Sequence, residues 1–321
     1  MVHNSVDIEN DVVVTVLCTV YNHEKYLREC LEGIVKQKTN FKFEAIVHDD
    51  ASTDNSQAII KEYAIRYPDI IKPILQKENQ YSKHDGSLTK AINPNIKGQY
   101  IAICEGDDFW IDANKLQLQV DFMDRHPDVV LCFHTVKILS EKYCKRQQLY
   151  SHLREGYVNA NTIIEKWTVP TCSAVIRKEI YLSVPYDRRF IVGDNVIWLT
   201  CCSKGKVYCM DNVMATYRRS TNGWTLDSFG NDKVKVLCKY KEMLLHFKTL
   251  QTYFPNVASL ALSNKIKDYY ARIFVLSLLK DRSECLKYGK EGFIGYGFKF
   301  IFEVIQRIWF YVKIRMNSIV K

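Results

Sequence analysis

The segment VVVTVLCTV, residues 12–20, decides the fold. It is rich in β-branched residues and apolar on both faces, which is the pattern of a parallel strand buried inside a sheet. The polar group that follows, Thr19 to Asn22, therefore stands at the carboxyl end of that strand. Asn22 is also a candidate cap for the amphipathic helix that we expect over residues 26–35.

Further apolar segments repeat this arrangement along the first 110 residues. We expect strands at Phe43–Val47, Ile71–Leu75 and Tyr100–Cys104, and a helix that begins near Thr53 or Asp54 and ends before Pro68. The alternation of strand and helix predicts an α/β fold with a doubly wound, mostly parallel sheet flanked by helices. Ligands of such sheets bind outside the carboxyl ends of the strands. Later segments predict strands at Val129–Thr135 and Thr171–Ile176 and a helix at Asp194–Cys202.

The acidic turn Glu105-Gly106-Asp107-Asp108 follows the strand that ends at Cys104. Carboxylates that crowd behind a buried strand repel one another, and a divalent cation relieves that repulsion because hard cations prefer carboxylate oxygen. Such a cation, Mn²⁺ or Mg²⁺, bridges a diphosphate and neutralises the charge that grows on it as it leaves. The alternative is a solvated acidic turn that caps the next helix.

A second acidic turn, His48 to Asp54, follows the strand Phe43–Val47. A carboxylate at this place accepts hydrogen bonds from the N–H of a nucleotide base or from ribose hydroxyls, and Asp50 is the candidate. Asp54 better suits the alternative role at the start of a helix, where acidic side chains complement the helix dipole.

Three segments taken together carry a family resemblance. VVVTVLCTVYNHEKYLRECLEGIVKQ, EAIVHDDASTDNS and GQYIAICEGDDFW resemble, in order and spacing, the amino-terminal half of the family 2 inverting glycosyltransferases of GT-A fold. The resemblance runs to about residue 135. It implies a GT-A-like sheet and a nucleotide-diphosphate-sugar donor, with Thr19 and Asp50 at the base. Tyr21 and Asn22, in the same turn as Thr19, complete this side of the expected donor site.

By this resemblance Glu105 and Asp107 take the outer positions of the family's DxD motif, with Asp107 as the direct metal ligand. Glu105 stands where aspartate is usual, so it keeps a carboxylate with a reach one methylene longer, and we expect it to support the metal. Lys115-Leu116-Gln117 and Gln119 are similar to a subset of the family that builds bacterial surface polysaccharides.

Asp194 opens the apolar segment GDNVIWL, residues 193–199. An inverting transfer needs one base to take the proton from the acceptor hydroxyl. The placement of Asp194 resembles that of the base in the family's Glu-Asp motif, with Gly193 where glutamate is common. The alternative is that Asp194 only caps a helix.

The segment Ala215–Thr225 is similar to the family's Tyr-Arg-x-His…Gly-Trp-Ser segment, and we expect a flexible Gly-containing loop that closes over a diphosphate. Arg218 or Arg219 is therefore a candidate phosphate ligand, with Arg218 the one assigned to the donor site. Ser220 stands in place of the histidine that can touch the metal in relatives, which leaves no third protein ligand there. The alternative is an ordinary exposed basic loop.

The basic charge of the chain is confined to its carboxyl-terminal part. The net charge is +9, and residues 231–321 hold 17 Lys/Arg and 7 Asp/Glu, whereas the first 230 residues carry a net charge of −1. We therefore expect a catalytic domain over residues 1–230 and a helical, basic extension over residues 231–321.

One helix of that extension is expected to meet a membrane surface. Residues 293–312 are apolar and aromatic, but Lys299, Glu303, Gln306 and Arg307 interrupt them on one helical face. This predicts a helix that lies on an anionic cytoplasmic leaflet without crossing it. The alternative is a helix packed on the catalytic domain with its polar side outward.

Composition narrows the compartment and the class of function. The 11 cysteines form no CxxC pair and residues 1–11 are mostly polar, which is typical of a cytoplasmic protein without a signal peptide. The resemblance to family 2 implies a metal-dependent hexosyl- or N-acetylhexosaminyltransferase that acts on a glycan or lipid-linked acceptor, and the basic tail places it, by expectation, at the inner face of the cell membrane.

Two other functions remain as alternatives. A nucleotidyltransferase that makes sugar nucleotides usually has a Gly-rich loop after the first strand, and the turn Thr19 to His23 has no glycine. A non-catalytic nucleotide- or nucleic-acid-binding protein is disfavoured because no nucleic-acid motif accompanies the basic tail, so we expect no nucleic-acid partner.

Overall fold

The buried segment of residues 12–20 forms the strand β1 (Val12–Val20) in the computed structural model. The structure describes residues 11–140, 148–149, 154–166, 168–219, 232–278 and 282–319. β1 pairs in parallel with β2 (Lys42–Asp49) on one side and with β4 (Tyr100–Ile103) on the other. Its apolar side chains are buried on both faces, as the composition of the segment predicts.

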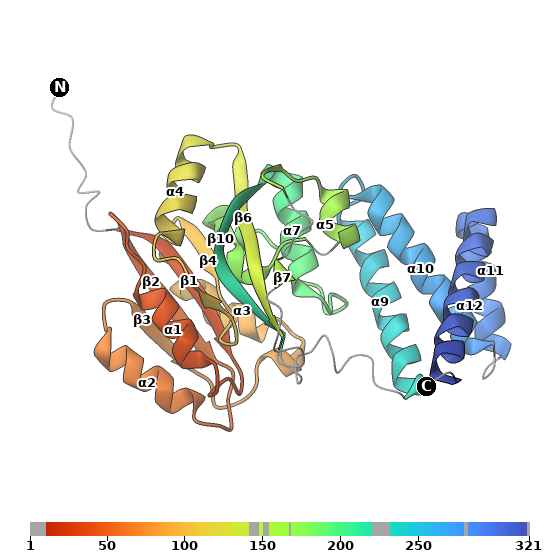
Figure 1. The fold of residues 1–321 in the computed structure, drawn as a ribbon, viewed down its shortest axis with the longest axis horizontal. Helices are drawn as coiled ribbons and strands as arrows, with labels where there is room; N and C mark the ends of the chain where they lie inside the picture. The colour runs from red at the N-terminus through yellow and green to blue at the C-terminus, as the bar shows by residue number, and fades with distance from the viewer. Residues whose placement is uncertain are drawn as a thin grey trace. The chain divides into compact units, whose positions relative to one another are not determined.

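One sheet contains ten strands of the described residues, with the order β3-β2-β1-β4-β9-β6-β10-β5 along its main path. The remaining strands are β3 (Ile71–Leu75), β5 (Phe109–Trp110), β6 (Val129–Ser140), β7 (Gln148–Leu149), β8 (Gly156–Tyr157), β9 (Val175–Arg177) and β10 (Lys206–Arg219). The ladders from β3 to β4 are parallel, and β10 runs parallel to β6 (Figure 1). β9 runs antiparallel to both of its neighbours, β4 and β6. The predicted α/β class and mostly parallel sheet are confirmed.

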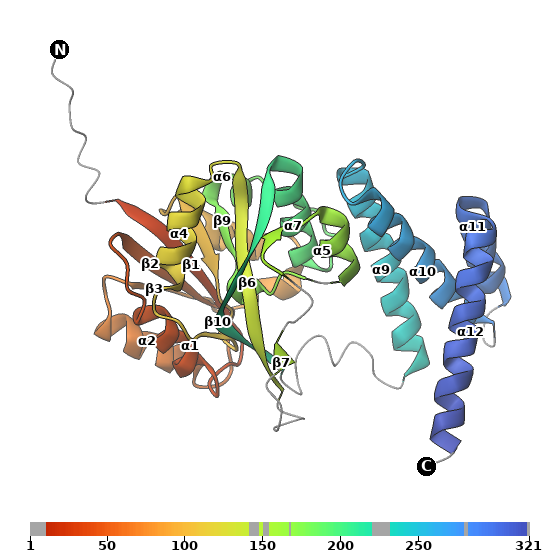
Figure 2. The same cartoon turned by 45° about the horizontal axis from the view of Figure 1, so that its top comes forward.

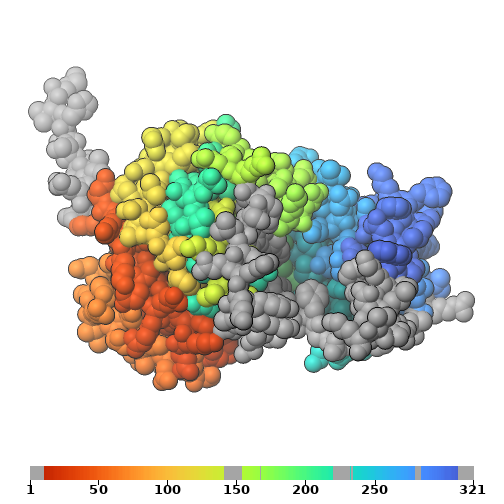
Figure 3. Space-filling model, in the orientation of Figure 1, coloured from red at the N-terminus to blue at the C-terminus, as the bar shows by residue number. Residues whose placement is uncertain are grey.

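Helices cover both faces of the sheet. The elements are α1 (Leu27–Val35), α2 (Ser56–Arg66) and α4 (Lys115–Arg125) on one face, and α3 (Ser87–Ile92), α5 (Ala160–Lys166), α6 (Lys178–Leu182) and α7 (Gly193–Lys204) on the other. Each face has its own apolar core, because alternate side chains of β1 point to opposite sides. The amino-terminal segments coloured red and orange lie side by side on the surface of this half of the chain (Figure 3).

One of the later segments differs from the sequence prediction. The segment predicted as one strand, Thr171–Ile176, divides into a 3₁₀ turn at Thr171–Ser173 and the short strand β9. The Ser173 N–H and hydroxyl both donate to the Pro170 carbonyl oxygen, which closes the turn. The helix predicted at Asp194–Cys202 is confirmed as α7.

Three of the four family-subset residues at the start of α4, Lys115, Leu116 and Gln119, are buried, whereas Gln117 is only partly buried. The Gln119 side-chain amide donates to the Cys132 and Ser173 carbonyl oxygens at 3.0 and 2.9 Å, which links α4 to β6 and to the 3₁₀ turn. Lys115 Nζ lies 4.2 Å from the centre of the Trp110 ring. Burial lowers the pKa of Lys115 to about 8, because the apolar surroundings disfavour its charged form.

The chain divides into two compact units. The first consists of Met1–Arg188 and Asp194–Ser220, and the second of Arg189–Gly193 and Thr221–Lys321. The second unit contains α9 (Lys233–Tyr253), α10 (Ser259–Ser277), α11 (Arg282–Tyr296) and α12 (Phe298–Ile319), so the predicted helical extension is present. Within it α10 packs against α9, α11 and α12 (Figure 2). The expected boundary at residue 230 lies outside the described residues.

None of the described helices combines the length and the apolar character that crossing a bilayer requires.

Gly98 allows the backbone before β4 to approach β1 closely. A Cβ atom at this position would lie 2.3 Å from the Thr15 backbone nitrogen, and the Gly98 N–H donates to the Thr15 hydroxyl at 2.8 Å. Gly98→Ala is therefore expected to destabilise the first unit by about 2–4 kcal/mol, because neither backbone can yield without breaking the β1–β4 pairing. Thermal unfolding followed by circular dichroism measures the effect.

Gly295→Ala in α11 is the matched control, because a Cβ atom there meets nothing within 4 Å and alanine favours the helix. An unchanged melting temperature for Gly98→Ala would contradict the close approach.

Candidate functional site

The carboxyl ends of β1, β2 and β4 meet where the strand order reverses. The chain proceeds from β1 through β2 to β3 on one side and continues with β4 on the other side of β1. The Asp50 N–H donates to the Val20 carbonyl oxygen at 2.9 Å, and the Gly106 N–H donates to the Thr19 carbonyl oxygen at 3.0 Å. Both predicted acidic turns therefore attach to the end of β1, at the crevice where such sheets bind ligands.

Gly106 gives the Glu105–Asp108 turn its close fit against β1 and α1. A Cβ atom at Gly106 would lie 2.8 Å from His23 Nδ1, 3.0 Å from Val20 Cγ2 and 3.3 Å from Leu27 Cδ1. A side chain at this position would clash with His23 and Val20 and displace the turn, so glycine is required here.

Arg218 holds the acidic turn from the opposite side. The Arg218 backbone N–H donates to Asp108 Oδ1 at 2.7 Å, and Nη1 donates to the Asp107 carbonyl oxygen at 2.8 Å. Nη2 donates to Glu29 Oε2 at 2.6 Å, which ties the turn to α1. One arginine thus connects β10, the turn and α1.

The location of Arg218 corrects the sequence prediction. The sequence predicts a flexible loop that closes over a diphosphate, or alternatively an exposed basic loop, but Arg218 lies on β10 with 7% of its surface exposed. Charged and small residues interrupt the alternation of apolar and polar residues in the segment 206–219, so the sequence pattern did not predict this strand. The rest of the expected loop, with Ser220, lies outside the described residues.

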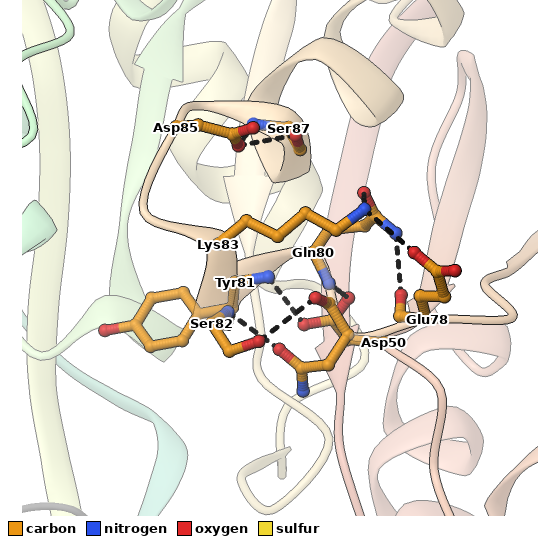
Figure 4. A network of polar contacts seen from close by, with 9 residues as sticks. Asp50, Glu78, Gln80, Tyr81, Ser82, Lys83, Asp85 and Ser87 are labelled. Carbon is orange, nitrogen blue, oxygen red and sulfur yellow. Dashed lines mark hydrogen bonds and ion pairs between the residues drawn. The ribbon is translucent and has the colours of Figure 1, made fainter.

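Asp50 binds the loop that follows β3. Its two carboxylate oxygens accept the Gln80 N–H at 2.6 Å and the Tyr81 N–H at 3.0 Å (Figure 4). The carboxylate is 5% exposed at the residue level and lies beneath the loop, whereas the Tyr81 ring points away from it (Figure 4). Asp50 therefore positions one wall of the predicted donor site.

The remaining donor-site candidates lie at the rim of the same crevice. Thr19 is half-buried at the end of β1, and Tyr21 is 48% exposed. Asn22 does not cap α1, which begins at Leu27. Its φ angle of 56° turns the chain, and its side-chain oxygen accepts the Thr53 N–H at 2.7 Å, so Asn22 joins the β1 turn to the β2 turn.

Asp194 lies in the first turn of α7, one residue after the helix begins, where an acidic side chain also complements the helix dipole. Burial raises the pKa of the Asp194 carboxyl to about 6. Burial also raises the pKa of Glu105 to about 8, and the charges of Asp194 and Asp107 add to that shift. The charge of the candidate base therefore reaches Glu105, one of the candidate metal-side carboxylates.

The acidic turn is chemically suited to a divalent cation. Glu105 Oε2 is buried without a hydrogen-bond donor, and burial together with the charges of Asp107 and Glu105 raises the pKa of Asp108 well above its usual range. A cation beside Asp107 and Glu105 would supply the missing positive charge. The described residues contain no group of three side chains arranged to hold a metal by themselves, so diphosphate oxygens and water would complete its coordination.

Two residues near the site were missed in the sequence. His23 packs beneath Gly106, and burial lowers the pKa of its ring although the nearby Asp107 carboxylate opposes that shift. Tyr81 is anchored by Asp50, and partial burial and the charge of Asp194 raise the pKa of its hydroxyl. His23 has no ligand spacing, but its place four residues beyond Thr19 was a usable signal. Tyr81 carried none.

Comparison with known proteins gives a family match and several relatives. Residues 15–183 match the model of Glycosyl transferase family 2. An uncharacterised protein of Mycobacterium bovis is 34% identical over 211 residues, which are 65% of this chain and 60% of that protein. The chain thus spans about three fifths of the length of its mycobacterial relatives.

Two named relatives add to this picture. An uncharacterised glycosyltransferase of Methanocaldococcus jannaschii is 23% identical over 281 residues, which are 85% of this chain and 88% of that protein. The minor teichoic acid biosynthesis protein GgaB of Bacillus subtilis is 32% identical over 221 residues, which are 65% of this chain and 23% of that protein.

Solved structures share the fold. S. aureus TarS 1-349 in complex with UDP has a TM-score of 0.53 and 16% identity, with 89% of each chain covered. The mannosyltransferase PcManGT from Pyrobaculum calidifontis, in complex with GDP-Man and Mn²⁺, has a TM-score of 0.52 and 13% identity, with 92% of this chain and 87% of that chain covered.

Replacement of Arg218 tests its role in holding the acidic turn. Arg218→Lys is expected to destabilise the first unit by about 1–3 kcal/mol, because lysine cannot donate from two positions to Asp107 and Glu29 at once. Arg28→Lys is the matched control, because the Arg28–Glu62 pair is about half exposed on both sides and is expected to change stability by less than about 0.5 kcal/mol. Equal melting temperatures for the two variants would show that Arg218 does not hold the turn.

Proposed function

The chain belongs to glycosyl transferase family 2, and from this premise we propose that it transfers a sugar, with inversion, from a nucleotide-diphosphate-sugar donor to a glycan or lipid-linked acceptor. The observation that carries the proposal is the convergence of Asp50, Glu105 and Asp107 at the ends of β2 and β4, with Asp194 close enough to act on Glu105. The fold is of the GT-A type.

The donor is proposed to lie across the ends of β1, β2 and β4. Its base would contact Thr19, Tyr21 and the loop that Asp50 positions, and its diphosphate would face Asp107. The structures of TarS with UDP and of PcManGT with GDP-Man support a nucleoside diphosphate sugar as the chemical class. Because the Arg218 guanidinium already donates to Asp107 and Glu29, we assign it to holding the turn and not to reaching out for phosphate.

A divalent cation, Mn²⁺ or Mg²⁺, is proposed beside Asp107, with Glu105 in support. When bound, it neutralises the negative charge that develops on the departing diphosphate. The Mn²⁺ in the PcManGT structure and the unpaired buried oxygen of Glu105 support this assignment.

Asp194 is proposed as the base of the transfer. The acceptor oxygen attacks the anomeric carbon from the face opposite the nucleotide, and the bond from that carbon to the diphosphate oxygen breaks as the new bond forms. The hydroxyl proton passes to Asp194, and the nucleoside diphosphate leaves with the bonding electron pair. With a pKa of about 6, Asp194 is ionised at neutral pH and is more basic than an exposed aspartate.

A role in surface polysaccharide biosynthesis is proposed from the likeness to the teichoic acid biosynthesis protein GgaB. Because residues 293–312 predict a helix that lies on an anionic cytoplasmic leaflet, we propose that this chain acts at that face of the membrane.

Asp107→Asn tests the metal side of the site. The variant is expected to lose at least about tenfold in Mn²⁺-dependent binding of UDP or GDP, because one anionic ligand of the cation is removed. Calorimetric titration with and without Mn²⁺ measures it. Asp121→Asn, an exposed aspartate on α4, is the control. Unchanged Mn²⁺-dependent binding in Asp107→Asn would remove Asp107 as the metal ligand.

Asp194→Asn tests the base. Donor binding is expected to stay within about twofold, whereas sugar transfer falls by about 10²–10⁴, the contribution of a general base. A panel of UDP- and GDP-sugars with released nucleoside diphosphate as the readout provides the assay.

The pH profile gives an independent check on the same residue. The folded-state pKa of Asp194 is raised, so the ionised base is lost as the pH falls through about 6, and wild-type transfer is expected to decline about tenfold per pH unit below that value. A wild-type rate in Asp194→Asn, or a flat profile between pH 5 and 7 (about one unit on either side of the pKa), would contradict the assignment.

A further inference from the structure

The last helix, α12, turns its charged side inward. Glu303 lies 3.8 Å from Lys267 Nζ of α10, and Arg307 pairs with Asp268 of the same helix. Arg272 also donates to Asp268 at 2.8 Å, so a network of ion pairs joins α12 to α10. The alternative of a helix packed with its polar side outward is therefore wrong for Glu303 and Arg307.

Apolar packing fixes the same orientation. Phe300 and Val304 are buried on the inner side of α12. The Phe300 ring meets the Phe274 ring of α10 edge to face at 6.1 Å, and a Cβ atom on Gly292 of α11 would lie 2.5 Å from it. Rotation of α12 about its axis would break both this packing and the ion pairs, so the outward side is set by the structure.

The outward side of α12 is almost entirely apolar. Its large residues are between 40% and 84% exposed and are spaced by three or four along the helix, which places them on one face; they are Phe298, Ile301, Phe302, Ile305, Ile308 and Trp309. We call this surface the outer apolar face. Phe293 and Ile294 of α11 extend it, because the Phe293 and Phe298 rings lie 6.4 Å apart.

Exposed lysines lie on the two helices that form this face. They are Lys287 and Lys290 on α11, where Glu291 is also exposed, and Lys299 on α12. The whole region 231–321 carries a net charge of +10 from the sequence. A second copy of the chain would bring a like charge to the same face, which opposes self-association, whereas an anionic lipid surface complements both its apolar and its basic character.

We propose that the outer apolar face of α12 docks on an anionic lipid bilayer. The side chains of Phe302, Ile305 and Trp309 enter the boundary between headgroups and acyl chains, with α12 parallel to the membrane plane, and the lysines contact acidic headgroups. Resting on the transferase function proposed above, this assigns the acceptor to the lipid-linked class, because a bilayer-bound enzyme meets an acceptor confined to the same surface.

Vesicle co-sedimentation of the full chain tests the docking. The probes are phosphatidylcholine vesicles with and without about 30% phosphatidylglycerol, enough to give an anionic surface. The wild type is expected to bind the anionic vesicles at least about tenfold more tightly than the neutral ones. The triple variant Phe302→Gln, Ile305→Gln, Trp309→Gln is expected to lose at least about thirtyfold of that binding, because three apolar side chains no longer enter the bilayer.

A matched control replaces three exposed apolar residues elsewhere, Ile65→Gln, Leu245→Gln and Leu260→Gln, and is expected to bind like the wild type. Charge reversal at Lys287, Lys290 and Lys299 to glutamate is expected to remove the preference for anionic vesicles. Wild-type binding by the Phe302, Ile305 and Trp309 variant would overturn the proposal. The proposal would also be overturned if the wild type did not bind vesicles and instead formed a dimer in analytical ultracentrifugation that this variant does not form.

Release of nucleoside diphosphate from the donor, measured without vesicles on the same proteins, separates this proposal from the transferase function. Vesicle binding without donor turnover would leave the docking intact and contradict the transferase. Donor turnover without vesicle binding would do the reverse.

Discussion

The hydrogen bonds of Arg218 to the Glu105–Asp108 turn are the interaction on which the site depends. The turn crowds three carboxylates at the end of a buried strand. Burial there raises the pKa of Glu105 to about 8 and raises the pKa of Asp108 well above its usual range. Such a cluster opens toward water unless donors hold it. The Arg218 backbone N–H and guanidinium supply those donors, while the Thr19 carbonyl oxygen fixes the turn to β1. The Glu105 Oε2 oxygen has no hydrogen-bond partner, so a cation would bind favourably beside it.

The same crowding links the two halves of the proposed reaction. Asp194 comes from α7, far along the chain from β4, yet its charge contributes to the raised pKa of Glu105. A metal beside Glu105 and Asp107 would therefore also change the field at the base. Asp50 has a structural role in the proposed donor site. Its two carboxylate oxygens accept the backbone N–H groups of Gln80 and Tyr81 and so position the loop that follows β3.

Much of the fold could be predicted because β1, β2 and β4 are buried on both faces and read as continuous apolar segments. The acidic turns could be predicted because their charge follows those segments directly. Arg218 was misplaced because β10 carries charged residues along its length and its burial depends on Glu29, which is 189 residues away in the sequence. For α12 the sequence predicts one charged face and one apolar face but leaves open which of them points outward. Glu303 and Arg307 pair with Lys267 and Asp268 of α10, and this tertiary packing leaves the apolar face outward.

The most direct test of the central claim is the position of Mn²⁺, located by anomalous scattering in crystals grown with Mn²⁺ and a nucleoside diphosphate. The account predicts an anomalous peak within bonding distance of an Asp107 carboxylate oxygen, about 2.0–2.3 Å, with diphosphate oxygens on the far side of the ion and the base at the ends of β1 and β2. A nucleotide bound at those strand ends with Mn²⁺ elsewhere, or a nucleotide bound away from the Glu105–Asp108 turn, would contradict it.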